Sequence, residues 1–370
     1  MRYVDEYRDK KLIDKLAQDI KGITPRGAIN FMEVCGTHTQ SFFRFGVGKL
    51  LPSNIHLISG PGCPVCVSPQ GYIDTAIALA KQKNTIIATF GDMLRIPGSE
   101  STLEKERAKG AQITVVYSAA DSLKIARANS RARVIFLAVG FETTAPTIGL
   151  SIIAAGKENL KNLSFFSALK LIPPAMEYLI KDERLNLAGF LCPGHVSAII
   201  GIRPYEFIPK KYRIPCCIAG FEPIDILEAL YILLKQVRDN KPSVANQYTR
   251  AVRREGNPKA KRIISRVFQT TDSYWRGLGK IPGSGLKIRK ESAQFDAAKV
   301  FDIKPATSDP ACPAGRQRPA TKCKCGDVLK GLITPVECAL FSKICTPDNP
   351  IGPCMVSQEG ACSAYYRYKK

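Results

Sequence analysis

The sequence predicts an α/β protein with two similar Rossmann-like α/β domains around a cleft and a smaller, irregular, mainly helical domain. Five short apolar runs, each closed by a glycine turn, support the first part of this prediction. Runs that are apolar over their whole length are typical of parallel strands covered on both faces, and the segments between them are long enough for crossover helices. With their turns, these runs span 55–66, 85–98, 132–147, 187–201 and 212–225.

The same pattern suggests the domain organisation. Apolar residues recur every four positions in 10–21 and predict an amphipathic N-terminal helix. We expect two α/β domains, at 25–120 and 121–235. Beyond them the regular pattern stops, and Gly/Pro-rich and cysteine-dense stretches predict a third domain over 236–370 that also includes residues 1–24. Ligands of such sheets bind at the carboxyl ends of the strands, so we expect the functional site there.

The chain has 370 residues and thirteen cysteines, and it is long enough to fold without a disulfide framework. Its N-terminal stretch mixes both charges without an apolar core, so it predicts neither a signal peptide nor a membrane anchor. We therefore expect a cytoplasmic protein with no membrane partner. In that reducing compartment, clustered thiols are more often metal ligands or catalytic groups than structural staples.

The charge is strongly positive, with 54 Lys+Arg against 32 Asp+Glu and a net charge of +22. Residues 241–300 alone carry 14 basic and 4 acidic side chains. This segment shows no zinc-finger, RRM or KH signature, so we do not expect nucleic acid as a partner. We interpret the segment as a solvated basic face or a docking patch for an acidic protein.

The C-terminal tail holds six cysteines within forty residues. They do not form the two CxxC knuckles that zinc modules usually show. Spread thiolates suit a cuboidal iron–sulfur cluster, which needs four ligands, so the third domain is predicted to be an iron–sulfur domain. An apolar, cysteine-rich core without metal is the alternative, and spacing alone does not choose four ligands from six. The six are Cys323, Cys325, Cys338, Cys345, Cys354 and Cys362.

Cys35 and His38 follow a strand-like run in the motif CGTHT. Thr37 or Thr39 can cap a helix, and amides at a helix N-terminus lower the pKa of a thiol and favour thiolate. A thiolate with an imidazole three residues away can act as a nucleophile or as a metal ligand. Packing of Cys35 in an apolar core is the alternative reading.

Cys63 and Cys66 form a CxxC pair in the loop GPGCPVC. This spacing occurs in dithiol redox centres and in half of a zinc knuckle. No second CxxC completes a zinc site, and Pro64 stiffens the turn between the two thiols. Reversible thiol chemistry is therefore favoured.

Glu142 in GFETT and His195 in PGHVS each follow a predicted strand. Each is a weak signal alone, because a helix-capping cluster and a surface histidine explain them equally well. Their common place after strands predicts that they line one shared cleft.

Taken together, these motifs resemble the HypD family of [NiFe]-hydrogenase maturation proteins over about residues 10–366. The motifs occur in the expected order: CGTHT, GPGCPVC, GFETT, PGHVSAIIG, GFEPIDIL and the spacing Cys-x14-Cys-x6-Cys-x16-Cys. The resemblance implies two α/β domains and a [4Fe-4S] cluster domain. It implies that the cluster ligands are Cys323, Cys338, Cys345 and Cys362, and that Cys325 and Cys354 form a thiol pair near the cluster.

The resemblance also implies a function as a redox-active assembly scaffold rather than a conventional enzyme. In this family an iron ion is shared between the CGTHT cysteine, here Cys35, and the partner HypC. The Fe(CN)2CO group is built there with cyanide from HypE, with HypF upstream, before transfer to the hydrogenase large subunit. On this reading His38 positions or protonates, Cys63 and Cys66 supply electrons or bind iron, and Glu142 and His195 line the cleft.

Two other classes of function are considered. A free-standing iron–sulfur thiol-disulfide reductase would turn over a generic disulfide without HypC. A metal-stabilised nucleic-acid binder would bind with a steep salt dependence. Neither explains why Cys35 and His38 occur together with the CPVC loop.

Overall fold

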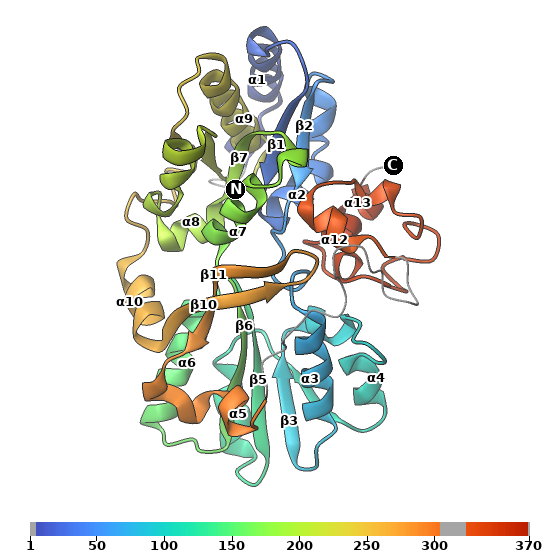
Figure 1. Cartoon of the computed structure of the whole chain (residues 1–370), viewed down its shortest axis with the longest axis vertical. Coiled ribbons are helices and arrows are strands. Elements are labelled where there is room, and N and C mark those ends of the chain that lie inside the picture. Colours follow the sequence, from blue (N-terminus) through green and yellow to red (C-terminus); the bar gives the residue numbers. More distant parts are fainter. Residues whose placement is uncertain (1–4, 304–322, 369–370) are drawn as a thin grey trace.

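The computed structural model describes residues 5–303 and 323–368. Two parallel β-sheets organise the chain, one above the other in Figure 1. The upper sheet has the strand order β2-β1-β7-β8-β9 and the lower sheet has the order β4-β3-β5-β6. The upper strands are β1 (Ile29–Glu33), β2 (Ile55–Ser59), β7 (Leu187–Pro193), β8 (Cys216–Ala219) and β9 (Val244–Asn246). The lower strands are β3 (Thr85–Thr89), β4 (Gln112–Val115), β5 (Arg133–Gly140) and β6 (Leu163–Leu169).

The α/β class with two Rossmann-like parallel sheets is confirmed, but the predicted boundaries do not coincide with the sheets. β1 pairs with β2 and with β7, while β3 pairs with β4 and with β5. The predicted units 25–120 and 121–235 therefore each contribute strands to both sheets. The chain leaves the upper sheet after β2, builds the whole lower sheet and returns at β7. Local apolar patterns cannot reveal this, because parallel pairing joins strands that are far apart in the sequence.

Helices cover the sheets as crossover connections. Beside the upper sheet, α1 (Lys10–Ile23) packs against α9 (Pro223–Arg238), which confirms the predicted N-terminal helix. The other helices near this sheet are α2 (Gly36–Arg44), α7 (Ile172–Ile180) and α8 (Gly194–Ile200). The helices of the lower sheet are α3 (Gln70–Ala80), α4 (Leu103–Ala108), α5 (Asp121–Ala128) and α6 (Ala145–Lys157), with α10 (Pro258–Val267) on α6 and α11 (Ala297–Val300) beside β6.

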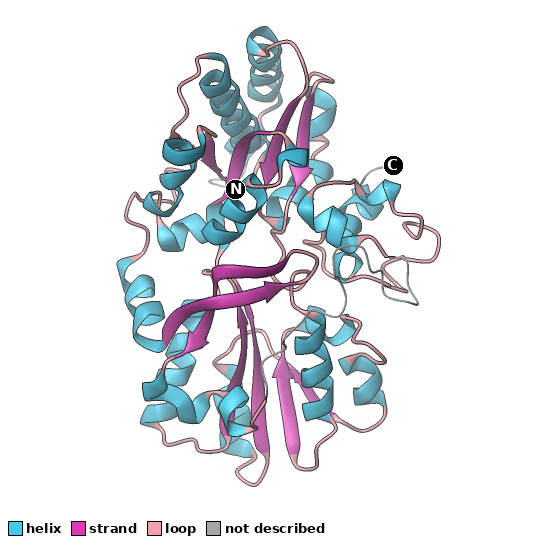
Figure 2. Ribbon diagram, viewed as in Figure 1, coloured by secondary structure: helices cyan, strands magenta, loops and turns pink. Residues whose placement is uncertain are grey.

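An antiparallel hairpin, β10 (Phe268–Trp275) with β11 (Gly279–Ile288), lies between the two sheets in Figure 1. The hairpin tip reaches toward the C-terminal tail. The tail contains α12 (Cys325–Lys330) and α13 (Ala361–Tyr368), joined largely by loops and short turns (Figure 2). α13 packs against α2, where the rings of Phe43 and Tyr365 lie 4.3 Å apart. This irregular tail agrees with the prediction that the regular pattern of apolar strands stops in the C-terminal part of the chain.

Short helical turns complete the described chain. They are η1 (Asp5–Arg8), η2 (Val47–Leu50), η3 (Gly91–Arg95), η4 (Glu183–Leu185), η5 (Arg203–Tyr205), η6 (Ile208–Tyr212), η7 (Lys290–Phe295), η8 (Pro335–Glu337) and η9 (Pro353–Met355). Across the described ranges, none of the helices has the length and apolar character needed to cross a membrane.

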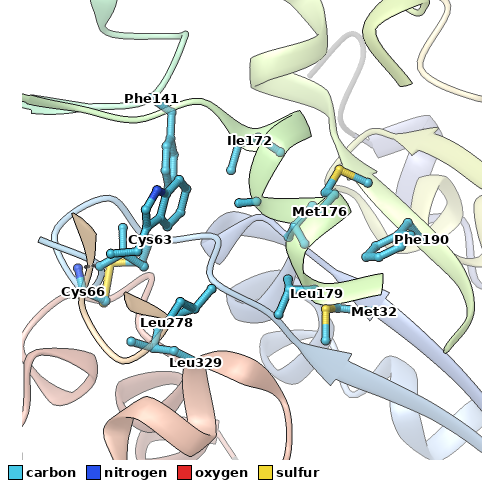
Figure 3. Close-up of a cluster of buried hydrophobic side chains, with 14 of the residues drawn as sticks. Met32, Cys63, Cys66, Phe141, Ile172, Met176, Leu179, Phe190, Leu278 and Leu329 are labelled. Atoms are coloured by element: carbon cyan, nitrogen blue, oxygen red, sulfur yellow. Dashed lines mark hydrogen bonds between the residues drawn. A yellow bond between two sulfur atoms is a disulfide. The ribbon is translucent and has the colours of Figure 1, made fainter. Parts of the chain in front are cut away.

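One buried cluster joins both sheets, the hairpin and the tail (Figure 3). Met32 comes from β1, Phe141 follows β5, and Leu278 and Leu329 come from the hairpin and α12. The Cys63–Cys66 loop lies inside this cluster. Residues of four sequence motifs, GPGCPVC, GFETT, PGHVSAIIG and the cysteine tail, therefore meet at a packed junction, and this junction positions the candidate site.

Candidate thiol centre at the junction of the two sheets

Cys35 follows the carboxyl end of β1 and is the N-cap residue of α2, without a side-chain capping hydrogen bond. The expectation that Thr37 or Thr39 caps this helix is wrong, because both residues lie inside α2. Two motif glycines allow other segments to approach it closely. A side chain on Gly62 would collide with the Cys35 backbone, and a side chain on Gly36 would collide with Glu359 of the tail. The Gly36 N–H donates a hydrogen bond to the Gly62 carbonyl at 3.1 Å. The CPVC loop and the tail are therefore both in contact with the CGTHT turn.

Glu33 holds this turn from inside the protein. Its fully buried carboxylate accepts a hydrogen bond from the Cys35 N–H at 2.9 Å and another from the Thr39 hydroxyl. Burial raises the pKa of Glu33 to about 7, although these hydrogen bonds lower it. Sequence analysis missed Glu33. The available signal was an acidic residue at the end of a mainly apolar strand.

The Cys35 thiol keeps its proton at neutral pH. Burial is the largest cause and, with the nearby Glu359 carboxyl, raises the pKa of Cys35 to about 12. The backbone amides of His38 and Thr37 lower the pKa, as a helix N-terminus should, but they are outweighed. The prediction that Cys35 is a thiolate is therefore wrong for the ligand-free protein. It assumed that the turn is exposed, whereas Cys35 is buried. A metal that binds Cys35 must displace this proton.

His38 is buried and fixed in one tautomer. Its Nε2 lies 2.9 Å from the Gly220 carbonyl oxygen and 3.2 Å from that of Ala219. Because carbonyls only accept hydrogen bonds, we assign the ring proton to Nε2. Nδ1 is buried and has no hydrogen-bond partner among the described residues. Burial also lowers the pKa of His38 to about 4, so the ring is neutral and offers a lone pair rather than a proton.

A single aromatic ring connects the two predicted histidines. Phe221, from the GFEPID motif, packs on His38 with ring centroids 4.8 Å apart and on His195 with centroids 4.1 Å apart. His195 stands exposed at the start of α8, and its partial burial lowers its pKa. His195 therefore packs on the same Phe221 ring as His38, which belongs to the Cys35 turn. Sequence analysis did not single out Phe221.

Glu142 lies just after β5 and is buried. Its Oε1 accepts a hydrogen bond from the Ile172 N–H at 3.0 Å, while Oε2 is buried without a partner in the described part of the chain. Burial raises the pKa of Glu142 to about 7. No hydrogen bond or ring contact between described residues joins Glu142 to His195. The predicted shared cleft of these two residues stays a prediction.

Cys63 and Cys66 form a disulfide, and both are buried. Cys66 Sγ lies 3.7 Å from the carbonyl oxygen of Pro353, the residue before Cys354. Each sulfur is bonded to the other in this state, so the pair does not present half of a zinc knuckle. Figure 3 shows the disulfide beside Leu278 of the hairpin and above Leu329 of the tail. Its reversible opening stays a prediction.

The tail thiols gather around one small hollow. Phe341, Met355 and six cysteines line it, namely Cys323, Cys325, Cys338, Cys345, Cys354 and Cys362. Hydrogen bonds with Cys325 and with Cys338 raise the pKa of Cys323, and the bond with Cys323 lowers the pKa of Cys338. Cys354 hydrogen-bonds to Cys362 in the same hollow.

This donor set fits an iron–sulfur cluster better than a single ion. The side chains in the lining that could ligate a metal are the six thiols and the Met355 thioether, and soft thiolates are the ligands of such clusters. In the described ranges no three histidine, cysteine or carboxylate side chains are arranged to hold one metal ion. A cuboidal cluster instead distributes its thiolates over four iron atoms. The lining does not show which four of the six cysteines would ligate a cluster. That choice still rests on the resemblance to the HypD family.

Glu359 joins the tail to the Cys35 turn. Its Oε1 accepts a hydrogen bond from the Thr37 hydroxyl at 2.9 Å, and the next residue, Gly360, lies against the Cys354 carbonyl. The segments that carry Cys35, the disulfide and the tail thiols are thus in contact with one another through neighbouring residues. Local sequence patterns gave no signal for Glu359, because it stands 322 positions from Thr37.

The fold and this site define a two-sheet α/β protein with a buried thiol, a disulfide and a hollow lined by thiols at one junction. Comparison with known proteins gives the particular family. The family described as "HypD: Hydrogenase formation hypA family" matches residues 11–369. The chain belongs to this family of hydrogenase maturation factors.

Individual relatives agree over the full length. The chain is similar to "Hydrogenase maturation factor HypD2" of Bradyrhizobium diazoefficiens, with 44% identity over 100% of this chain and 97% of that protein. It shares 43% identity with "Hydrogenase maturation factor HypD" of Cupriavidus necator, covering 100% of this chain and 97% of the relative. It shares 45% identity with "Hydrogenase expression/formation protein HupD" of Azotobacter chroococcum, with the same coverage.

Proposed function

We propose that the protein is the scaffold on which, together with HypC, the Fe(CN)2CO group of [NiFe]-hydrogenase is assembled. One observation supports this proposal above the others: the Cys35 turn contacts both the CPVC loop, through Gly62, and the cysteine tail, through Glu359. A cargo held at Cys35 would lie beside two separate sulfur sites. A protein that only binds iron would not need this arrangement.

The iron is the cargo in this proposal, and Cys35 is its attachment point. Cyanide and carbon monoxide favour electron-rich, low-spin iron, which soft thiolate ligands support. The Cys35 thiol gives up its proton when the iron binds, and HypC supplies a second thiolate. His38 is neutral, and its buried Nδ1 has a free lone pair, so it serves as an acceptor or ligand rather than as an acid.

Thiol chemistry supplies the electrons for cyanide transfer. A thiocyanate on HypE that takes up two electrons breaks its S–C bond and yields a thiolate and cyanide. Oxidation of two thiols to one disulfide releases two electrons and two protons, so the Cys63–Cys66 pair matches this demand. A [4Fe-4S] cluster held by Cys323, Cys338, Cys345 and Cys362 would supply electrons one at a time, with Cys325 and Cys354 as the neighbouring thiols.

The rival function is a free-standing iron–sulfur thiol-disulfide reductase. The disulfide next to the tail thiols favours redox chemistry of this kind. However, Cys63 and Cys66 are 2% and 0% exposed, so the disulfide of another protein cannot reach them without a rearrangement. Burial favours a small cargo delivered to the site over exchange with protein disulfides.

The test is the infrared spectrum of the anaerobically purified complex with HypC. The wild type should show the CN and CO stretching bands of Fe(CN)2CO, and Cys35→Ala should lose them. Cys217→Ala is the matched control, because Cys217 is another buried thiol and lies in β8, within a separate core cluster. Full-strength bands in Cys35→Ala would reject the assignment. Loss of the bands in the control as well would also reject it, because the effect would then not be specific to Cys35.

A further inference from the structure

The two carbonyls that fix His38 belong to a tight turn between β8 and α9, the AGFE turn (residues 219–222). His38 Nε2 donates to the Gly220 carbonyl at 2.9 Å and lies 3.2 Å from the carbonyl oxygen of Ala219, the last residue of β8. The ring of Phe221, in the same turn, packs on His38. The placement of His38 therefore depends on what holds this turn.

Gln247, the residue directly after β9, binds the AGFE turn. Its Oε1 accepts a hydrogen bond from the Gly220 N–H at 3.1 Å. This N–H and the Ala219 carbonyl belong to one trans peptide group, so they point in opposite directions. The peptide group is thus held by Gln247 at one edge and by His38 at the other. Hydrogen bonds at the two ends of a peptide group strengthen each other.

The orientation of the Gln247 amide is fixed by two carboxylates. Its Nε2 donates to Oδ1 of Asp225 at 2.9 Å and to Oε2 of Glu228 at 2.8 Å. Carboxylates only accept hydrogen bonds, so the amide oxygen must be the atom that faces the backbone N–H. Asp225 is itself fully buried and also accepts from the Glu222 N–H and from Arg250. The Gln247 amide cannot turn over without losing all three of its side-chain hydrogen bonds.

Glycines allow neighbouring elements to approach the same peptide group closely. A side chain on Gly220 would collide with Asp225 and with Tyr248. A side chain on Gly194 of the PGHVS motif would collide with the Ala219 carbonyl. Packing and hydrogen bonds therefore act together on the atoms that face His38.

We propose that Gln247 is a positioning residue, which holds the Ala219–Gly220 peptide group so that His38 keeps its proton on Nε2 and its buried Nδ1 lone pair remains available to the cargo. The inference deepens the proposed function and rests on it, because that function makes His38 an acceptor or ligand. Gln247 lies in the basic segment 241–300, which was interpreted as a solvated face or a docking patch. At this position the segment instead supports the candidate site.

The expected effect is a change of tautomer and not of charge. Loss of Gln247 leaves the Gly220 N–H without its acceptor, so rotation of the peptide group is no longer opposed. The Ala219 carbonyl then leaves Nε2, while the Gly220 carbonyl, which belongs to the next peptide group, still accepts. The preference for the Nε2–H form over the Nδ1–H form should fall by the worth of about one hydrogen bond, which is about fivefold.

The test is a two-bond proton–nitrogen NMR correlation spectrum of the full-length chain, labelled with nitrogen-15 histidine, at neutral pH. Such a spectrum shows which ring nitrogen of each histidine carries the proton. The chain has three histidines, and the exposed His56 and His195 are assigned by substitution with glutamine. The wild type should show His38 with its proton on Nε2 and a bare Nδ1.

Gln247→Met keeps most of the side-chain volume but offers only a weak acceptor, and it should lower the ratio of the two His38 tautomers about fivefold. Gln236→Met is the matched control. Gln236 also accepts a hydrogen bond from a backbone N–H, that of Ser243 just before β9, at 2.6 Å. This variant should leave the ratio unchanged. Far-UV circular dichroism verifies the fold of each variant.

A milder variant keeps the test valid if Gln247→Met does not fold. Gln247→Asn keeps the amide but is one methylene shorter, so it should lose the Gly220 N–H and lower the ratio in the same direction. An unchanged ratio in either folded variant, or an equal fall in Gln236→Met, would overturn the inference. A wild-type His38 with its proton on Nδ1 would overturn it without any substitution. Failure of the proposed function is seen separately, in the infrared bands of Cys35→Ala, because the NMR spectrum is recorded before the iron cargo is loaded.

Discussion

Gly62 lies against the backbone of Cys35, so close that any side chain at position 62 would overlap the Cys35 amide. The two residues belong to different motifs and are held together by the hydrogen bond from the Gly36 N–H to the Gly62 carbonyl. The glycine of GPGCPVC therefore sets the distance between the disulfide loop and the Cys35 thiol. Loss of this close approach separates two sulfur sites without removing either one.

Gly62→Ala tests this close approach. The added methyl group must push the CPVC loop away from Cys35, and overpacking of this kind costs about 1–3 kcal/mol. Gly22→Ala is the matched control, because Gly22 lies in α1 with no atom close enough to meet a methyl group. The control should gain up to about 1 kcal/mol from helix propensity. Urea unfolding of both variants measures the difference, and equal stabilities would contradict the described contact.

Glu142→Gln tests the raised pKa of this buried carboxyl. The pKa is about 7 in the folded chain against an ordinary value of 4.5, so the folded state binds the proton more tightly than the unfolded state. Its stabilising contribution is complete below pH 4.5 and is lost as the pH rises through about 7. The variant does not titrate and keeps an acceptor for the Ile172 N–H.

We therefore expect Glu142→Gln to be close to the wild type near pH 4.5 and more stable above pH 7, by on the order of 3 kcal/mol at most. The free energy of unfolding, measured at several pH values, gives this comparison. Glu100→Gln, which removes a carboxylate at an exposed position, is the matched control. A difference that did not change with pH would show that folding does not raise the pKa of Glu142.

Arg250→Met tests a buried ion pair near the His38 site. Arg250 binds both carboxylate oxygens of Asp225, which is fully buried and lies at the start of α9, close to Gly220. Removal of the cation leaves a buried charge without its main partner, so we expect a loss of about 3 kcal/mol. Arg184→Met breaks the exposed pair with Asp182 and should change the stability by less than about 1 kcal/mol. Thermal melting of the two variants gives the comparison.

Local patterns in the sequence predict much of the local structure. Apolar runs, glycine turns and the CxxC spacing locate the strands, the N-terminal helix and the motif turns, because each depends on a few neighbouring residues. The exchange of strands between the sheets could not be predicted in this way. β1 must choose its partners β2 and β7 from several apolar strands of similar composition.

The protonation states in the site could also not be predicted from the sequence. Cys35 was expected to be a thiolate because it begins a helix, yet burial and the distant Glu359 decide its pKa. His38 was expected to position or protonate, yet burial keeps its ring neutral and the carbonyls of Ala219 and Gly220 fix its tautomer. Both effects depend on residues that approach only when the chain is folded.

Iron-edge anomalous scattering from crystals of the anaerobically prepared, iron-loaded protein tests the central claim most directly. The account predicts a strong multi-iron peak in the hollow lined by the tail cysteines and a second, single-iron peak at Cys35, next to the CPVC loop. An empty hollow, or iron at Cys35 with the CPVC loop turned away from it, would contradict the account.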